Sequence, residues 1–291
     1  MPISKLARFA GLIGLALSLF GVAVAAGAGP HARVPVRIVS LSSTATEDLF
    51  AVGAGRQVVA VDDQSLVPKR APRTKLSGYT PNAEAIERYR PDLVVLAFDT
   101  NKIVEQLRKL GVRVLFEPPA ANLNGVYGQL EQLGQVTGHL QAGRQLVARL
   151  RARVAAIVRS VPRAGRLISV YHELDQTFYS ASSQTFVGQV YRLLGLRNIA
   201  DAAKSGGAYP KLSGEYIIAS NPDLIVLADT VCCGQSLKTV AARPGWAGLS
   251  AVTHHQVVAV PDWVASYWGP NIVDFLQLVA AHVKTIRAAG G

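Results

Sequence analysis

The chain has 291 residues and a formal net charge of +11 at pH 7; 49% of its residues are hydrophobic and 17% are charged. This length accommodates two ordinary domains with cores of their own, and the apolar content excludes a globally disordered chain. A basic balance can indicate nucleic acid or an anionic membrane as a partner. However, the arginines are spread along predicted helices rather than clustered with aromatic residues, so we expect a solvated basic surface and no nucleic-acid partner.

The N-terminal residues have the features of a secretory signal peptide. Lys5 and Arg8 precede an apolar run at 11–22, which is followed by small residues at 23–25. A membrane anchor is the rival interpretation, but the run is short for a bilayer. No cysteine follows the cleavage site, so we see no lipoprotein signal. We predict a signal peptide at 1–25, whose removal lowers the formal charge to about +9, and a soluble periplasmic protein.

The next residues predict the start of an α/β lobe. Arg37 to Leu41 begins its first strand, and Ser42 to Thr44 can cap the helix that follows. Glu47 and Asp48 lie in the early turns of that helix, where its dipole favours acids. The helix ends at Gly53-x-Gly55, which lacks the third glycine of a dinucleotide-binding fingerprint. Further expected elements are a strand at 58–61, a polar connection at 62–79, a helix at 102–110 and a strand at 112–116.

One stretch occurs twice in the chain. Residues 84–97 read EAIERYRPDLVVLA and residues 215–228 read EYIIASNPDLIVLA, with eight of fourteen positions identical. In each copy the Pro-Asp pair ends a short helix, because proline lacks an N–H and clashes with the preceding turn. The apolar run that follows shows no polar alternation, which is typical of a strand buried on both faces. Two copies so far apart in sequence indicate two similar α/β lobes facing one another.

A long amphipathic helix is predicted between the two copies. Apolar residues recur at three- and four-residue spacing through 139–161, arginines occupy the remaining face, and Pro162 ends the helix. At about 1.5 Å per residue this segment spans roughly 30 Å or more, so it can be a rigid spine. The second lobe then restarts at 166–170, which echoes 37–41. Its further elements are a helix at 185–194, a loop at 230–236, a strand at 257–260 and a helix at 271–287.

These patterns divide the mature chain into three segments. We place the N-terminal α/β lobe at 36–138, the linker helix at 139–162 and the C-terminal α/β lobe at 163–291. A helical spine resists bending more than paired strands or loops do, so we expect little hinge motion between the lobes.

Motifs of catalysis and of metal binding are absent from the sequence. It has no G-x-S-x-G elbow, no P-loop and no H-E-x-x-H. The six histidines do not form a spaced metal-binding set, and His254-His255 beside a strand is interpreted as loop surface. We therefore predict no catalytic residues, no metal site and no cofactor.

Aromatic residues gather at the predicted strand ends. In open α/β sheets, ligands bind outside the carboxyl ends of the strands. The residues are Phe98 and Tyr171, which follow strands, Tyr79 and Tyr209, which lie before the two repeat copies, and Trp263 and Trp268, which follow the last strand. Each one alone would fit ordinary packing. Six at equivalent edges of two lobes predict an apolar, aromatic-walled cleft for a flat or bulky ligand.

Four stretches together form a recognisable set: RIVSLSSTATEDLFAVG at 37–53, NAEAIERYRPDLVVLAF at 82–98, YPKLSGEYIIASNPDLIVLAD at 209–229 and VPDWVASYWGP at 260–270. From about residue 36 to its end, the chain resembles the periplasmic substrate-binding proteins of ABC importers for cobalamin and ferric siderophores, particularly the cobalamin-binding members. The resemblance implies an α/β fold class with two Rossmann-like lobes joined by a single long α-helix. It also implies ligand contacts at Tyr79, Phe98, Tyr171, Tyr209, Asp262 and Trp263.

The resemblance further implies that one glutamate in each lobe docks on basic residues of the permease, and Glu84 and Glu215 match those positions. Each lies two residues after a plausible N-cap, Asn82 or Ser213. An acid in the first helical turn gains roughly 0.3–1 kcal/mol from the dipole, which explains either glutamate alone. The dipole explains less well why both lobes of an arginine-rich chain have glutamate at the same position after the N-cap. We therefore predict that both glutamates dock on the permease.

The adjacent residues Cys232 and Cys233 depart from the pattern expected for cobalamin binders. In an oxidising compartment they can form a vicinal disulfide, or their thiolates can hold a soft metal. A loop pair without a ligand role is the third interpretation. Because the pair follows a strand of the second lobe, as Phe98 follows one of the first, we hypothesise that it borders the cleft.

We therefore predict a monomeric, exported binding protein, not an enzyme, that captures a bulky metal chelate and delivers it to an ABC permease dimer. Cobalamin is the leading ligand. A ferric siderophore or haem is the alternative, and Arg70, Arg73 and Lys75 could then face an anionic chelate. An exported sensor or an enzyme on the same fold is a further alternative.

Overall fold

The computed structural model of the protein describes residues 33–163, 165–203 and 206–289. The predicted signal peptide at 1–25 lies outside these residues. From Val34 onward the chain forms one compact unit. Within the described ranges, no helix combines the length and the apolar character that crossing a membrane requires.

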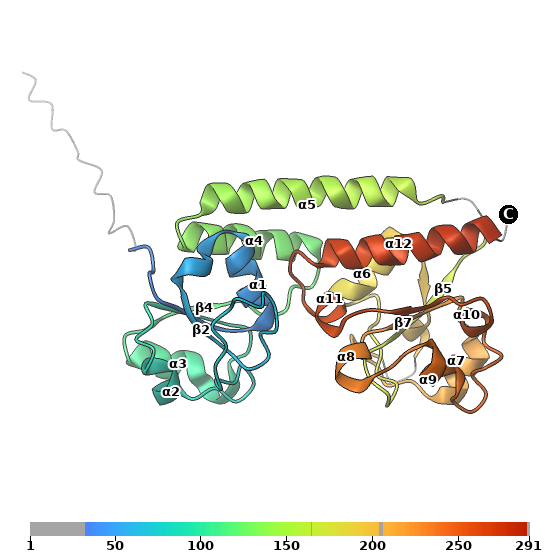
Figure 1. Ribbon diagram of the computed structural model, residues 1–291, viewed down its shortest axis with the longest axis horizontal. Coiled ribbons are helices and arrows are strands. Elements are labelled where there is room, and N and C mark those ends of the chain that lie inside the picture. The colour runs from blue at the N-terminus through green and yellow to red at the C-terminus, as the bar shows by residue number, and fades with distance from the viewer. Residues whose placement is uncertain (1–32, 164, 204–205, 290–291) are drawn as a thin grey trace, which may run out of the picture. The chain divides into compact units, whose positions relative to one another are not determined.

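Two parallel four-stranded sheets organise this unit, one in each half of the chain (Figure 1). The first has the order β2-β1-β3-β4 and the second the order β6-β5-β7-β8, so the two halves repeat one topology. The strands of the first sheet are β1 (Ile38–Leu41), β2 (Val58–Val61), β3 (Leu93–Leu96) and β4 (Arg113–Phe116). Those of the second are β5 (Ser169–Glu173), β6 (Arg197–Asn198), β7 (Leu224–Leu227) and β8 (Val257–Ala259).

The two copies of the repeated stretch form the same pair of elements in the two halves. In the first copy, helix α2 (Ala83–Glu87) leads into β3; in the second, α7 (Gly214–Ser220) leads into β7. Every residue of β3 and of β7 is buried. The strands lack polar alternation because both faces meet apolar cores: in β3, Val95 belongs to one buried cluster and Val94 to another. The predicted duplication is confirmed.

The aspartate of the repeated Pro-Asp pair holds the start of the neighbouring strand. The Asp92 carboxylate accepts hydrogen bonds from the backbone N–H groups of Val36 and Arg37 at 2.8 and 2.9 Å. Asp223 accepts one from the N–H of Ser169 at 2.8 Å. Strand β5 therefore begins at Ser169, and the predicted start at residue 166 is wrong by three residues.

The predicted spine is helix α5 (Leu140–Ser160), which has 21 residues. It packs against α4 (Leu123–Val136) of the first half and α12 (Ile272–Ala289) of the second (Figure 1). An ion pair of 2.8 Å between Arg153 and Asp274 adds a polar contact between α5 and α12. The largest apolar cluster runs through all three helices and includes Leu130, Leu150 and Phe275. The halves therefore share a core beneath α5 rather than being joined by a tether.

The remaining helices cover the sheets or form short connections. The α-helices are α1 (Ser43–Ala51), α3 (Ile103–Lys109), α6 (Phe186–Leu193), α8 (Thr230–Cys233), α9 (Leu237–Ala241), α10 (Ser250–Thr253) and α11 (Asp262–Ser266). Three 3₁₀ turns are η1 (Ala54–Gln57), η2 (Thr100–Lys102) and η3 (Ile199–Ala202). Helix α8 lies within the loop expected at 230–236, and α11 lies between the expected strand at 257–260 and the expected helix at 271–287. Both follow strands of the second sheet, so they border its carboxyl edge.

Candidate functional site

An exposed pair of aromatic rings lies at the carboxyl edge of the first sheet. Phe98 follows β3, as predicted, and Tyr79 reaches it from the connection after β2. The two rings stack with their centroids 5.6 Å apart and an angle of 26° between their planes. Tyr79 is 62% exposed and Phe98 is 38% exposed. Stacked rings that leave so much apolar surface in water form a platform for a flat or apolar ligand.

The platform opens onto a cavity of about 110 Å³ to which both halves contribute. The first half supplies Tyr79 and Phe98, among others, and the second half supplies Ser266, Tyr267 and Trp268. The Tyr267 hydroxyl donates a hydrogen bond of 2.9 Å to the backbone carbonyl of Gln64, which joins the halves at this point. Sequence analysis therefore identified three of the residues that line the cavity: Tyr79, Phe98 and Trp268.

A buried carboxyl group is among the polar groups that line this cavity. Burial raises the pKa of Asp62 to about 6, although its carboxylate accepts a hydrogen bond of 2.6 Å from the Ser65 hydroxyl. Gly78 passes directly over it: a Cβ there would lie 2.7 Å from an Asp62 oxygen and 2.6 Å from the Leu41 carbonyl. Only glycine fits that space, so Gly78 allows the connection to bring Tyr79 across the sheet edge.

Tyr171 does not lie in the cavity, contrary to the sequence-based prediction. Its side chain is fully buried in the apolar core of the second half, where it meets Trp246 at a centroid distance of 6.1 Å. Its hydroxyl donates to the Glu173 carboxylate at 3.2 Å. The prediction assumed that the strand ends before Tyr171, whereas β5 continues to Glu173 and places Tyr171 inside the sheet. We do not propose Tyr171 as a ligand contact.

Tyr209 and Trp263 are accessible but lie apart from this cavity. Tyr209 is 53% exposed in the loop before α7, and Trp263 is partly buried in α11. Neither is among the residues that line the cavity with the aromatic platform. Their contact with a ligand stays a prediction.

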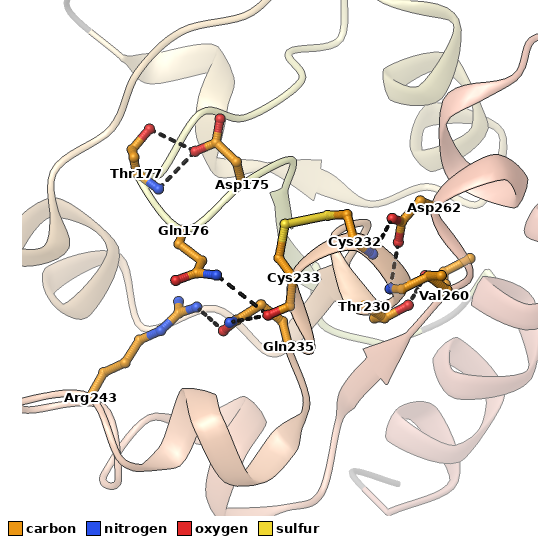
Figure 2. Close-up of a disulfide and its surroundings, with 11 residues drawn as sticks. Asp175, Gln176, Thr177, Thr230, Cys232, Cys233, Gln235, Arg243, Val260 and Asp262 are labelled. Atoms are coloured by element: carbon orange, nitrogen blue, oxygen red, sulfur yellow. Dashed lines mark hydrogen bonds between the residues drawn. A yellow bond between two sulfur atoms is a disulfide. The ribbon is translucent and has the colours of Figure 1, made fainter. Parts of the chain in front are cut away.

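Asp262 supports the loop that carries the two cysteines. Its carboxylate accepts hydrogen bonds from the backbone N–H groups of Val231 at 2.9 Å and Cys232 at 2.8 Å (Figure 2). Cys232 and Cys233 are joined by a disulfide, so the thiolate metal site considered in the sequence analysis is not formed. Because Asp262 begins α11, whose C-terminal residue Ser266 lines the cavity, the disulfide loop is hydrogen-bonded to an element of the candidate cleft.

A second set of contacts holds the other side of the disulfide loop. The Cys233 carbonyl accepts hydrogen bonds from the side-chain amides of Gln176 at 3.4 Å and Gln235 at 3.3 Å (Figure 2). The side-chain oxygen Oε1 of Gln235 accepts one of 2.7 Å from the Arg243 guanidinium. Arg243 in turn makes a bidentate pair with Glu173, with both N···O distances 2.6 Å. The loop is therefore fixed to the interior of the second half.

Sequence reasoning missed this ion pair and several buried acids. Burial raises the pKa of Asp229 to about 7, and both of its carboxylate oxygens lack a hydrogen-bond partner among the described residues. In the first half, burial raises the pKa of Glu47 to about 7 and that of Glu117 to about 8, and it raises the pKa of Asp48 well above its usual value. Glu47 and Asp48 lie in the early turns of α1, as predicted, but both are buried.

These carboxyl groups do not amount to a metal centre. Across the described ranges, no three histidine, cysteine, aspartate or glutamate side chains are grouped so that they could hold a metal ion.

The two predicted docking glutamates occupy equivalent positions. Both are exposed in the first turn of a helix. The predicted N-caps are confirmed: the Asn82 side chain accepts from the Ala85 N–H at 2.8 Å, and the Ser213 side chain accepts from the Tyr216 N–H at 3.1 Å. Hydrogen bonds from its own backbone N–H and from Ser213 lower the pKa of Glu215. Each half thus presents a carboxylate at the same place in its repeated stretch.

Sequence comparison agrees with this architecture. Residues 38–263 match the profile of a family described as periplasmic binding proteins. An uncharacterised ABC transporter substrate-binding lipoprotein of Bacillus subtilis is 28% identical over 261 residues, which cover 86% of this chain and 81% of that protein. A cobalamin-binding protein of Halobacterium salinarum is 34% identical over 199 residues, which cover 66% of this chain and 53% of that protein. The chain thus spans about half of the halobacterial relative.

Solved structures share the fold. The vitamin B12 binding protein of Vibrio cholerae superposes with a TM-score of 0.73 at 24% identity, covering 87% of this chain and 98% of that one. A periplasmic heme-binding protein of a Roseiflexus species superposes with a TM-score of 0.75 at 24% identity, covering 86% and 98%. The fold is therefore shared by periplasmic binding proteins that are named for different ligands.

Proposed function

The chain belongs to the periplasmic binding protein family, and from this premise we propose that it captures a metal chelate, with cobalamin the leading ligand, and delivers it to an ABC importer. The observation that carries the proposal is the stacked and exposed Tyr79–Phe98 platform, beside a cavity that both halves line. The halobacterial relative is named a cobalamin-binding protein, and the Vibrio cholerae protein with this fold is named a vitamin B12 binding protein.

The platform suits a macrocycle better than a small solute. A small-molecule site usually encloses about 300–1,000 Å³, and the cavity beside the rings has only about 110 Å³. A bulky chelate would therefore rest over the rings and use the cavity for one projecting group. Asp62, whose pKa is about 6, could accept a hydrogen bond from an amide of that group.

Charge distribution favours cobalamin over an anionic chelate. A ferric siderophore would call for basic side chains at the cleft, and Arg70, Arg73 and Lys75 were the candidates. Arg70 instead lies 5.1 Å from the Phe50 ring, and Arg73 donates to the Asp63 carbonyl at 3.2 Å. None of the three is among the residues that line the cavity, whereas the carboxyl of Asp62 is. Haem stays the second candidate, because its apolar face also fits stacked rings and the Roseiflexus neighbour is named for it.

Delivery would use the two glutamates. We propose that the protein is exported by a signal peptide at 1–25, acts as a monomer without enzymatic activity, and docks on a permease dimer through Glu84 and Glu215. Their equivalent positions on the two halves suit a partner with two similar subunits, each of which offers a basic side chain.

A thermal-shift panel tests the ligand assignment. Purified protein is heated with cyanocobalamin, haemin or a ferric hydroxamate; a ligand at a hundredfold excess over its dissociation constant should stabilise the fold by about 2.7 kcal/mol. We expect the shift with cyanocobalamin, its loss in the double variant Tyr79→Ala/Phe98→Ala, and its persistence in Tyr179→Ala, which removes an exposed ring elsewhere. A shift with haemin alone would transfer the assignment to haem, and no shift with any probe would refute it.

A further inference from the structure

A cavity larger than the one at the aromatic platform has no part in the proposed function. It has a volume of about 810 Å³ and lies beside α5, with walls from the start of α4, one face of α5 and the exposed side of α6. It shares no lining residue with the cavity at the aromatic platform. Because α4 belongs to the first half and α6 to the second, a ligand in this cavity would contact both halves.

The lining of this cavity carries charge of a single sign. Arg151 comes from α5, Arg163 from the segment just after α5, and Arg192 from α6. No aspartate or glutamate is among the lining residues. The salt bridges found among the described residues involve none of these three arginines. Like charges around one hollow repel each other, and an anion placed between them would relieve that repulsion.

The walls are held in place by contacts of their own. The Arg151 guanidinium lies 4.3 Å from the centre of the Tyr127 ring and donates to the Asn124 side chain at 3.4 Å. The Gln189 amide of α6 donates to the Ala121 carbonyl, just before α4, at 2.9 Å, which links the two halves at the cavity. A stacked guanidinium keeps its fork of N–H donors oriented, so less side-chain entropy is lost when an anion binds.

We propose that this cavity is a binding site for a multiply charged anion of the phosphate class. A single carboxylate is satisfied by one guanidinium fork, whereas three arginines present more donors than one carboxylate can accept. A phosphate or pyrophosphate group supplies several acceptor oxygens and a charge near −2 or beyond. The same chemistry occurs in soluble phosphates and in phospholipid headgroups that carry a phosphomonoester, such as that of phosphatidic acid.

The experiment compares two variants of equal charge. Arg163→Gln/Arg192→Gln removes two exposed cavity arginines. Arg144→Gln/Arg149→Gln removes two exposed arginines of α5 that do not line the cavity. Purified protein and both variants are titrated with inorganic pyrophosphate in low-salt buffer by calorimetry. In parallel, they are sedimented with vesicles of phosphatidic acid and phosphatidylcholine.

We expect the cavity variant to bind at least tenfold more weakly and the control variant to bind within twofold of the parent protein. If the cavity variant loses only pyrophosphate binding, the ligand of the cavity is a soluble phosphate. If it loses only vesicle binding, the ligand is a lipid headgroup. Binding of neither probe, or equal loss in both variants, would overturn the proposal, because the second result means that only overall charge matters. Cyanocobalamin binding in the cavity variant should be unchanged, so the outcome is independent of the platform.

Discussion

The pair between Arg243 and Glu173 is the interaction whose loss should cost this protein most. Glu173 is fully buried, and the Arg243 side chain is 15% exposed, so each charge depends on the other. Replacing Arg243 by methionine leaves the Glu173 carboxylate buried without a cation. It also removes the hydrogen bond to Gln235 and the contact of the guanidinium with the Trp246 ring, 4.7 Å away.

Breaking a buried pair from one side costs about 3–5 kcal/mol. That loss is a large part of the roughly 5–15 kcal/mol that stabilises a typical domain. The matched control is Arg153→Met, because the side chains of Arg153 and Asp274 are 54% and 56% exposed; an exposed pair of this kind contributes about 0–1 kcal/mol.

Urea unfolding followed by circular dichroism measures both free energies. A double variant, Arg243→Met/Glu173→Gln, should recover part of the loss, since it leaves no unpaired charge. If Arg243→Met destabilises the protein no more than Arg153→Met, or if the double variant recovers nothing, then the buried pair does not hold this half together and the reasoning is wrong.

Three further predictions concern the platform, docking and pH. Replacing Tyr79 or Phe98 by alanine should each weaken ligand binding about tenfold in calorimetry, close to the 0.5–1.5 kcal/mol of one aromatic contact; unchanged affinity would place the ligand elsewhere. Glu84→Lys/Glu215→Lys should abolish permease-dependent uptake while leaving the ligand dissociation constant within twofold, and normal uptake would rule out docking at these positions. The unfolded chain releases the proton of Glu117 near pH 4.5, whereas the folded protein keeps it until about pH 8, so stability should fall as pH rises across this window. Urea unfolding at pH 5 and pH 8 should therefore show a smaller fall for Glu117→Gln than for the parent protein; an equal fall would mean that other acids cause it.

The sequence was sufficient for the features that depend on local chemistry. Proline, capping residues and an unbroken apolar run define each repeated helix–strand pair, and three-four spacing defines α5. Phe98 was found because it follows a strand end that such patterns locate well, and Tyr79 because it lies just before the first repeat copy.

Features that depend on distant partners could not be found in this way. Glu173 and Arg243 are 70 residues apart, and nothing in either local sequence indicates the other. The error at Tyr171 arose because β5 continues through His172 and Glu173, two polar residues that look like the end of a strand and are buried only through their distant partners Tyr191 and Arg243. From sequence, Asp48 is interpreted as an acid that the helix dipole favours, and its burial depends on tertiary packing that the local sequence does not indicate.

The apolar cluster shared by α4, α5 and α12 determines whether either half of the chain can fold when the two are separated. Cutting the polypeptide near residue 162 would leave Leu130 and Leu150 on one fragment and Phe275 on the other, so each fragment would lose the part of the shared core that the other supplies. Neither fragment would be an autonomous folding module, despite the internal duplication. The protein should therefore melt in one cooperative transition. After a gene duplication, both copies would have had to lose the ability to fold alone.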